Sequence, residues 1–362
     1  MFLDSILYLM KILDKYFTRQ LVGIFVMLLM ILTGLSWMVQ IMSMMKFLIS
    51  YGVKLTNFLG LTVMMVPFIL SIIVPFVTFI AVLFVYNKMI GDNEVVVMVS
   101  SGTSPGKIAR PALVLAGLLT AANLVLNLWI VPATQAKFYD TQWNLRYGLA
   151  HLKLQEGAFT EMTRDLVVYV DKVSGYDLNH VMLSDTRKDK SQMIIFAENG
   201  KLITTMRGLS IVMTKGAMQA TGNGSIIGTF DSFDMDLSIA TKNNSSSFKT
   251  RRMPTGELLR YASQDDLTVK QRKTVLTELC NRFLQPMMNL ILAALCLAIL
   301  LRSSLLRRRA SFAPALSVVS MSVVMAAFMS ASNMLETTTH LFLLGGAQAV
   351  LFGIIMVVLL KK

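Results

Sequence analysis

The chain has 362 residues, of which 54% are hydrophobic and 15% are charged, and its formal net charge is +13. Soluble globular proteins carry about a quarter charged residues, so this composition argues against a soluble enzyme and favours a membrane protein. The excess of basic residues fits a nucleic-acid surface or a membrane surface, and its distribution along the chain decides between the two.

The first 19 residues contain apolar side chains at helical spacing, with Asp4, Lys11 and Lys15 toward the other side. They lead directly into an apolar run and have no small-residue cleavage site, which argues against a signal peptide. Two interpretations remain open. Residues 1–19 form an amphipathic helix in the cytoplasmic interface, or they extend the first membrane span.

Six charge-free runs follow, each close to or above the roughly 20 residues that a helix needs to cross about 30 Å of hydrocarbon. Buried helices of a soluble core would need six such cores with almost no polar face. We therefore predict six transmembrane helices in two groups of three, within residues 20–136 and 271–362. The runs are Leu21–Met45, Leu55–Asn87, Pro111–Ala136, Phe283–Leu301, Ala310–Leu335 and Thr337–Leu360.

A short segment, residues 91–102, connects the second and third runs. Asp92 and Asn93 resemble a helix N-cap, Glu94 suits the first turn of a helix, and Gly102 suits its C-terminal stop. Residues 95–99 form an apolar ridge whose valines favour a strand by local propensity. The segment is thus either a short helix whose ridge is covered by a partner or a loop that lies on lipid.

The same region resembles a phosphate-binding loop only superficially. A Walker A loop requires four residues between its glycines and a Ser or Thr after the lysine. Here three residues separate Gly102 from Gly106, and Ile108 follows Lys107. We therefore expect no cofactor in this chain, and any ATP and Mg²⁺ would be bound by another subunit.

Residues 137–270 are predicted to form an inserted all-β domain of the sandwich or jelly-roll type. Residues 135–270 carry 17 basic and 15 acidic side chains, so they contribute little to the net charge. From Asp165 onward, short β-rich runs alternate with turn signals, and Asn199-Gly200 predicts a hairpin between two runs. The insert lacks cysteine and contains no evident catalytic set. The three histidines, His151, His180 and His340, are interpreted as ordinary surface residues.

The basic residues that flank the spans predict the topology. Twelve lie on one side, before the first span, between the second and third, between the fourth and fifth and after the sixth, whereas five lie on the other. The positive-inside rule therefore predicts that both termini are cytoplasmic and that the β domain lies outside the cytoplasm. The basic excess then marks topology, not a nucleic-acid site.

The segment "NEVVVMVSSGTSPGKI" resembles the coupling helix of the LptF/LptG permease family of the lipopolysaccharide export machinery. The segment "LKLQEGAF" resembles that family's approach to its periplasmic jelly roll. The resemblance covers essentially the whole chain and is closer to LptF, because the insert lacks the tryptophan-containing first strand associated with LptG.

The resemblance implies a non-catalytic permease subunit that extracts lipopolysaccharide from the outer leaflet of the inner membrane. The implied partners are a second LptF- or LptG-like permease, a dimer of the ATPase LptB, and LptC, whose jelly roll continues the periplasmic bridge. Contacts with the ATPase are implied for Asp92, Glu94, Val97, Met98 and Gly102.

Lipopolysaccharide presents phosphates at the leaflet surface and acyl chains below it, so its site needs basic groups above an adaptable apolar wall. The candidate lipid-binding residues are Trp37, Met38, Gln40, Met42, Met45, Lys46, Lys54, Lys137, Arg146, Arg282 and Phe328. Related LptF sequences can carry basic residues in the outer half of the first span. This chain instead has Trp37 and Gln40 there, and its first base on that side is Lys46.

Two other classes of protein are weighed. A secondary transporter normally needs intramembrane charge, which the spans nearly lack. A membrane-anchored scaffold of an envelope assembly complex, without its own transport path, would use the β domain for assembly, although six spans exceed what an anchor requires.

Overall fold

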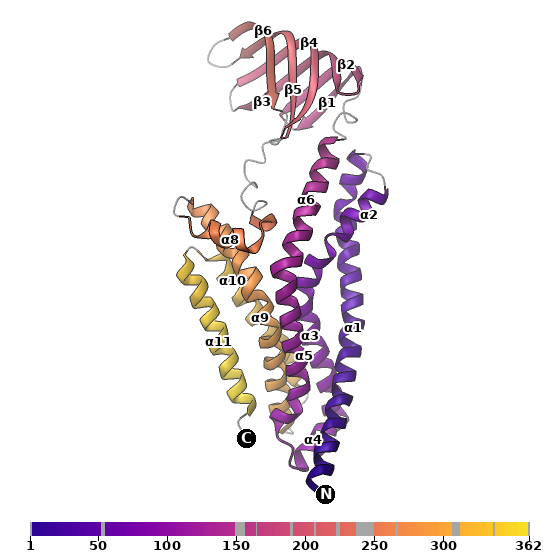
Figure 1. Ribbon diagram of the computed structural model, residues 1–362, viewed down its shortest axis with the longest axis vertical. Coiled ribbons are helices and arrows are strands. Elements are labelled where there is room, and N and C mark those ends of the chain that lie inside the picture. Colours follow the sequence, from indigo (N-terminus) through magenta and orange to yellow (C-terminus); the bar gives the residue numbers. More distant parts are fainter. Residues whose placement is uncertain are drawn as a thin grey trace. The chain divides into compact units, whose positions relative to one another are not determined.

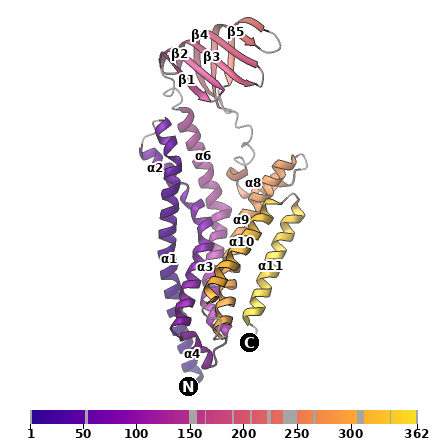
Figure 2. The ribbon, with the colours of Figure 1, turned by 180° about the vertical axis from the view of Figure 1, so that it is seen from behind.

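A computed structural model describes residues 2–51, 55–148, 156–163, 165–188, 191–205, 208–221, 225–236, 250–264, 267–305, 312–335 and 337–360. The chain divides into two compact units, a helical unit of residues 1–40, 64–137 and 246–362 and a second unit of residues 41–63 and 138–245. The second unit holds the β-strands. Figure 1 and Figure 2 show the elements of both units.

The helices are α1 (Phe2–Tyr51), α2 (Leu55–Val63), α3 (Val66–Gly91), α4 (Glu94–Ser100), α5 (Pro105–Val125), the π-helical segment η1 (Leu126–Ile130), α6 (Val131–Gly148), α8 (Thr255–Ala262), α9 (Val269–Leu305), α10 (Ala313–Asn333) and α11 (Thr338–Leu360). Among the described residues, six stretches are long and apolar enough to cross a membrane, which confirms the predicted spans. They are Asp14–Met45, Leu55–Gly91, Pro105–Gln142, Val269–Ser303, Ala313–Asn333 and Thr338–Leu360.

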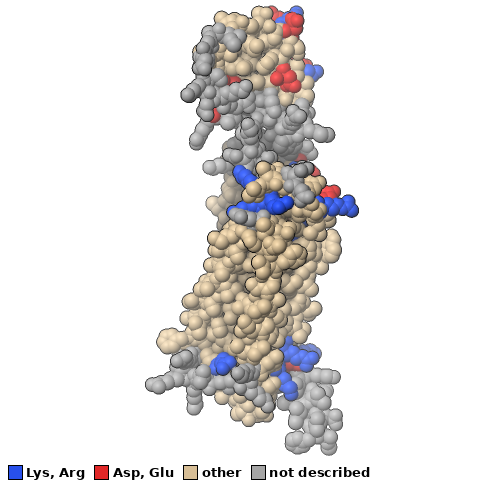
Figure 3. Space-filling view, turned by 90° about the vertical axis from the view of Figure 1, so that its left-hand side faces the viewer, with Lys and Arg blue, Asp and Glu red and all other residues tan. Residues whose placement is uncertain are grey.

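The N-terminal segment continues into the first span without a break, because α1 is one helix from Phe2 to Tyr51. At the other end of the insert, residues 250–262 belong to the helical unit, although the sequence assigned everything up to residue 270 to the β domain. On the face drawn in Figure 3, the described helices show a broad band without charged side chains between two zones where Lys and Arg gather. This pattern is that of a membrane-facing surface.

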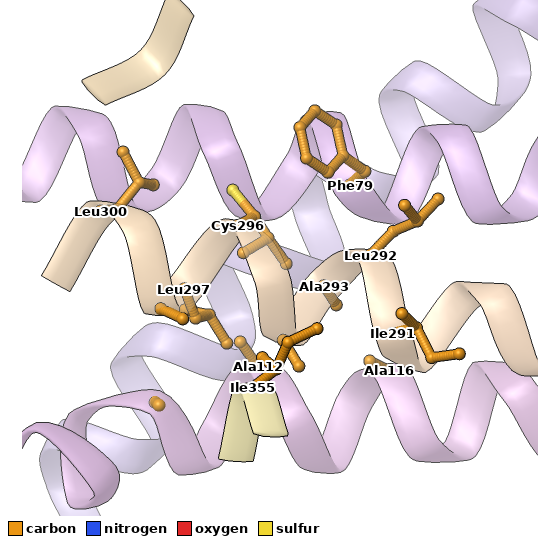
Figure 4. Close-up of a cluster of buried hydrophobic side chains, with 14 of the residues drawn as sticks. Phe79, Ala112, Ala116, Ile291, Leu292, Ala293, Cys296, Leu297, Leu300 and Ile355 are labelled. Carbon is orange, nitrogen blue, oxygen red and sulfur yellow. The ribbon is translucent and has the colours of Figure 1, made fainter. Parts of the chain in front are cut away.

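The core of the helical unit is built around α9, which packs against α3, α5, α10 and α11. Figure 4 shows Phe79 of α3, Ala112 and Ala116 of α5, and Ile355 of α11 around Ala293 and Cys296 of α9. The small alanines allow the backbones of α5 and α9 to approach closely, as is typical of helices in membranes. Both cysteines are free and buried.

Polar side chains also join these helices inside the spans. The Asn289 amide nitrogen donates to the Ala116 carbonyl at 3.0 Å and to the Thr120 hydroxyl at 3.2 Å. The Asn123 amide nitrogen donates to the Ser71 carbonyl at 3.2 Å, which links α5 to α3. Because each of these groups is buried, the bonds replace those that water would make and fix the register of the helices.

The described strands form one antiparallel sheet in the order β1-β2-β3-β4-β5-β6, which confirms the inserted all-β domain. The strand order is that of an up-and-down meander, and the six described strands contain no Greek-key crossover of the kind that joins the strands of a jelly roll. The strands are β1 (Ala158–Thr163), β2 (Leu166–Ser174), β3 (Asp177–Lys188), β4 (Ser191–Thr205), β5 (Gly208–Thr221) and β6 (Ser225–Asp236).

A line of residues crosses this sheet, and at this line the alternation of buried and exposed residues changes phase on the five strands β2 to β6. On β2, buried residues alternate as far as Val170, and then Asp171 and Lys172 are both exposed. The register pairs the residues on either side of this line and passes over one residue on each strand, namely Asp171 of β2, His180 of β3, Glu198 of β4, Lys215 of β5 and Asp231 of β6. We call these five residues the crease. His180 and Lys215 have φ values of 50° and 53°, a left-handed conformation that non-glycine residues rarely adopt.

The crease explains how one sheet encloses a core. Because each of the strands β2 to β6 shifts phase there, apolar side chains on both sides of the line reach the same buried cluster, for example Leu178 and Leu183 on β3. The predicted hairpin at Asn199-Gly200 is wrong, because both residues lie inside β4 and pair with β3 and β5. A Cβ added to Gly200 would lie 2.9 Å from the Val181 side chain, so this glycine permits close packing and not a turn.

Candidate functional site

The short helix α4 is held firmly against the helical core by the two helices that it connects. The Tyr86 hydroxyl near the end of α3 donates to the Ile108 carbonyl at the start of α5, at 2.8 Å, and both residues are buried. Val95 of α4 is also buried and belongs to the same hydrophobic core. The helix α4 is therefore in contact with α3 and α9, and α3 is bonded to α5.

The residues of α4 divide between an inner and an outer face. Met98 and Val99 pack against the core, whereas Val96 is 47% exposed and Val97 is 64% exposed. Glu94 lies half-buried in the first turn, and Asp92 is exposed just before it. Val97 is thus on the open face as predicted for a contact residue, whereas Met98 contacts its own chain. Val96, which the sequence analysis did not name as a contact residue, is exposed beside Val97.

The ends of α4 differ from each other in how well the sequence predicted them. The helix spans residues 94–100 and not 91–102, because Asn93 adopts a left-handed conformation with φ 60° and makes no side-chain cap. Its C-terminal end is a Schellman motif, in which the Gly102 N–H donates to the Val99 carbonyl and the Thr103 N–H to the Met98 carbonyl, both at 3.0 Å. Gly102 has φ +87°, so the predicted stop at this glycine is present.

A second candidate site is a cleft of about 240 Å³ among α3, η1, α6, α9 and α10. Phe328 lies in its wall, together with Met325 and Met329 of the same helix. Amide and hydroxyl groups also line the cleft, and the sequence analysis missed them because single polar residues inside apolar runs carry no periodic signal. They are Ser71, Asn127, Gln135, Asn281, Gln285 and Ser332.

Arg282 also borders this cleft, but its geometry argues against the predicted role in binding lipid phosphate. Its Nε donates to Glu278 at 3.1 Å. One terminal nitrogen donates to the Met253 carbonyl and the Thr255 hydroxyl, and the other to the carbonyls of Thr250 and Arg251. A guanidinium has five N–H donors, and all five are used within the chain. The Arg282 side chain is 3% exposed, so we assign it to fixing residues 250–255 on α9.

Of the predicted lipid-binding residues that the structure describes, only Phe328 and Arg282 line the cleft. Met38, Met42 and Met45 are exposed along α1, Trp37 and Gln40 are half-buried there, and Lys137 is exposed on α6. Lys46 and Arg146 lie in helices, but their side chains are outside the part of the chain that the structure describes, as is Lys54 altogether. The described residues therefore bring together Phe328 and Arg282 but none of the predicted lysines.

The six candidate spans found among the described residues and the inserted antiparallel sheet are those of a multi-span membrane protein with an inserted β domain. Among the described residues, no group of three or more His, Cys, Asp or Glu is placed to hold a metal ion. The family model of the lipopolysaccharide export system permease LptF/LptG matches residues 15–362, so the chain belongs to this family.

A curated relative is also similar to most of this chain. An uncharacterized protein of Rickettsia prowazekii (strain Madrid E) is 26% identical over 298 residues, which cover 80% of this chain and 81% of that protein. The family match makes this chain a permease subunit for lipopolysaccharide export, and it does not distinguish LptF from LptG.

Proposed function

We propose that this chain is one of two permease subunits of an ATP-driven exporter that extracts lipopolysaccharide from the outer leaflet of the inner membrane and passes it to a periplasmic bridge. The proposed partners are a second permease of the LptF/LptG family, an LptB-like ATPase dimer that binds ATP and Mg²⁺, and an LptC-like protein. The observation that carries the proposal is the burial pattern of α4. Val96 and Val97 are exposed, whereas Val95 of the same helix is buried in the hydrophobic core.

The proposed topology places α4 and both termini in the cytoplasm and the β domain in the periplasm. The distribution of basic residues supports this orientation. The helical unit adds a second argument, because a Cβ on Gly106 would lie 2.8 Å from the Leu360 side chain. The end of α11 therefore lies beside the start of α5, on the same side of the spans as α4.

In the proposed mechanism, ATP binding moves the ATPase subunits, which push on the exposed face of α4. Val95 and the Tyr86–Ile108 hydrogen bond pass this movement to α3 and α5, and these helices move relative to α9. The cleft at Phe328 lies between α3 and the α9–α10 pair, so its volume changes with that movement. Its apolar wall and polar lining suit a lipid that carries both acyl chains and sugar hydroxyls.

The test compares Val97→Asp with Val97→Leu in the complex purified with its ATPase. An exposed aspartate at this position replaces an apolar contact by an ion that must lose water on docking, so we expect Val97→Asp to release the ATPase. Val97→Leu keeps the apolar contact and should retain both the ATPase and lipopolysaccharide extraction into acceptor vesicles.

Glu94→Lys provides a second variant, because it reverses the charge at the first turn of α4. If the ATPase remains bound and extraction is unchanged in both Val97→Asp and Glu94→Lys, α4 is not the contact with the ATPase. If the assembled complex hydrolyses ATP but releases no lipopolysaccharide under any condition, the chain serves as a scaffold instead.

A further inference from the structure

A groove of about 900 Å³ lies among α9, α10 and α11, away from the cleft at Phe328. Ala298 of α9, Ala313 of α10 and Ile355 of α11 line it and are buried, whereas Leu316 and Ile354 line it and are exposed. The groove lies within three candidate membrane spans. An occupant of this groove therefore comes from the bilayer or from another membrane-spanning chain.

One end of the groove carries a cation. Arg302, in the last turn of α9, is exposed and lines the groove, and among the described residues it forms no ion pair. Ser303 lies beside it, but its hydroxyl donates to the Leu300 carbonyl at 2.9 Å, so Arg302 supplies the donors at this end. The lining contains no acidic residue among those described. As far as the described lining residues go, the groove is thus apolar, with the positive charge of Arg302 at one end.

We propose that this groove binds an anionic phospholipid of the cytoplasmic leaflet, with its phosphate on Arg302 and an acyl chain between α10 and α11. The inference rests on the proposed topology, which places the end of α9, the start of α10 and the end of α11 at that leaflet. Basic pockets between spans on the cytoplasmic side are suited to anionic headgroups, and the guanidinium fork matches a phosphate geometrically.

The form of the groove favours a lipid over a helix of a second protein. A helix that packed against α10 and α11 would meet the uncompensated charge of Arg302 at an apolar interface, which costs free energy unless an acid faces it. A phospholipid supplies the anion and the apolar chain in one molecule. The groove is lined by α11 residues up to Val358, close to the end of α11 that approaches α5.

The experiment uses the complete complex with its partner subunits, reconstituted into vesicles that contain photoactivatable phosphatidylglycerol. Cross-links are mapped by mass spectrometry in the parent complex and in Arg302→Gln and Ile354→Trp. Arg302→Gln removes the headgroup contact, and Ile354→Trp fills the groove with a larger side chain. We expect cross-linking to α9–α11 to fall about fivefold in Arg302→Gln, the effect of losing one basic contact with an anionic lipid, and to fall likewise in Ile354→Trp.

Matched controls distinguish the loss of lipid binding at the groove from general effects of removing a charge or adding a bulky side chain. Arg110→Gln removes another exposed cation near the same end of the spans, and Val350→Trp adds the same bulk one turn earlier on α11, outside the groove lining. Both should leave the cross-linking unchanged. Equal losses in Arg302→Gln and Arg110→Gln would overturn the proposal, as would cross-links between the groove and the partner permease in place of the lipid.

The outcome also separates this inference from the proposed function. Normal lipopolysaccharide extraction without phosphatidylglycerol at the groove would overturn the lipid site alone. Labelling of Ser303→Cys by a membrane-impermeant reagent from the periplasmic side would overturn the topology on which the lipid site depends.

Discussion

The guanidinium of Arg282 on α9 and the hydroxyl of Thr255 at the start of α8 lie 3.1 Å apart. The same hydroxyl donates to the Leu128 carbonyl at 2.7 Å, inside the π-helical segment η1 of the third span. The residues that return from the β domain are therefore bonded to the third and fourth spans at once. Pro132, four residues after Leu128, has no N–H to donate to the Leu128 carbonyl, and Thr255 supplies a donor to it.

Replacing Arg282 by methionine should release residues 250–255 from α9. The substitution removes five donors and leaves Glu278 with Arg251 as its remaining basic partner, at 3.9 Å. Breaking such a buried pair costs about 3 kcal/mol or more. We expect a lower melting temperature and faster hydrogen exchange at residues 250–262 by mass spectrometry. Arg260→Met, at an exposed position of α8, is the control and should change neither.

Thr255→Val removes the bond to η1 together with the hydroxyl oxygen that accepts from Arg282, because valine preserves the shape of the side chain and lacks the hydroxyl. The Leu128 carbonyl loses its donor, and we expect a loss of about 1 kcal/mol. Hydrogen exchange should accelerate at residues 126–130 and at the start of α8. Thr274→Val removes a similar hydroxyl that bonds only within its own helix, and the same acceleration in that variant would argue against the assignment.

Gly216→Ala should destabilise the β domain at its crease. The added Cβ would lie 2.3 Å from the Phe196 carbonyl oxygen and 2.4 Å from the Phe230 ring. The carbonyl belongs to the neighbouring strand and cannot move without loss of pairing, so overpacking of about 1–3 kcal/mol is expected. The measurement is limited proteolysis of the full chain.

Gly228→Ala is the matched control for this position, because its added Cβ would meet only the flexible end of Met218 at 3.7 Å. Equal proteolytic resistance of the two variants would show that the sheet tolerates a side chain at Gly216.

Gly102→Ala should loosen the C-terminal end of α4. The left-handed conformation costs a residue with a Cβ about 1–2 kcal/mol, so the Schellman motif becomes less stable. We expect weaker retention of the ATPase and faster exchange at residues 98–103. Gly91→Ala, with open space around its Cβ and no positive φ, should behave like the parent chain.

The spans and the β insert could be predicted from the sequence because their signals are long and repeated. A charge-free run of 20 or more residues has few alternative explanations, and several β-rich runs in series reinforce each other. The stop of α4 at Gly102 was predictable for a different reason, since glycine at that place has a specific conformational use. The strand propensity of Val95 to Val99 gave way to helix because Val95 and Val99 pack on the helical core.

The contacts of Arg282 and the role of Gly200 could not be predicted in this way. Arg282 lies near the end of a span. At that place, an arginine that binds a lipid phosphate and an arginine that bonds to its own chain give the same sequence pattern. The difference depends on carbonyls of residues 250–253, which are supplied by the backbone. Asn199-Gly200 has the composition of a turn, but the phase change at Glu198 and the approach of Val181 decide its conformation.

The crease also sets a rule for how the length of these strands can vary. Because the two sides of the line are out of phase, deleting His180 alone would turn the buried side chains of one half of β3 toward solvent while β2 and β4 kept theirs inward. A tolerated loss at the crease would have to occur in all the neighbouring strands together. Point substitutions along the line can accumulate one at a time, whereas single-residue insertions and deletions there cannot.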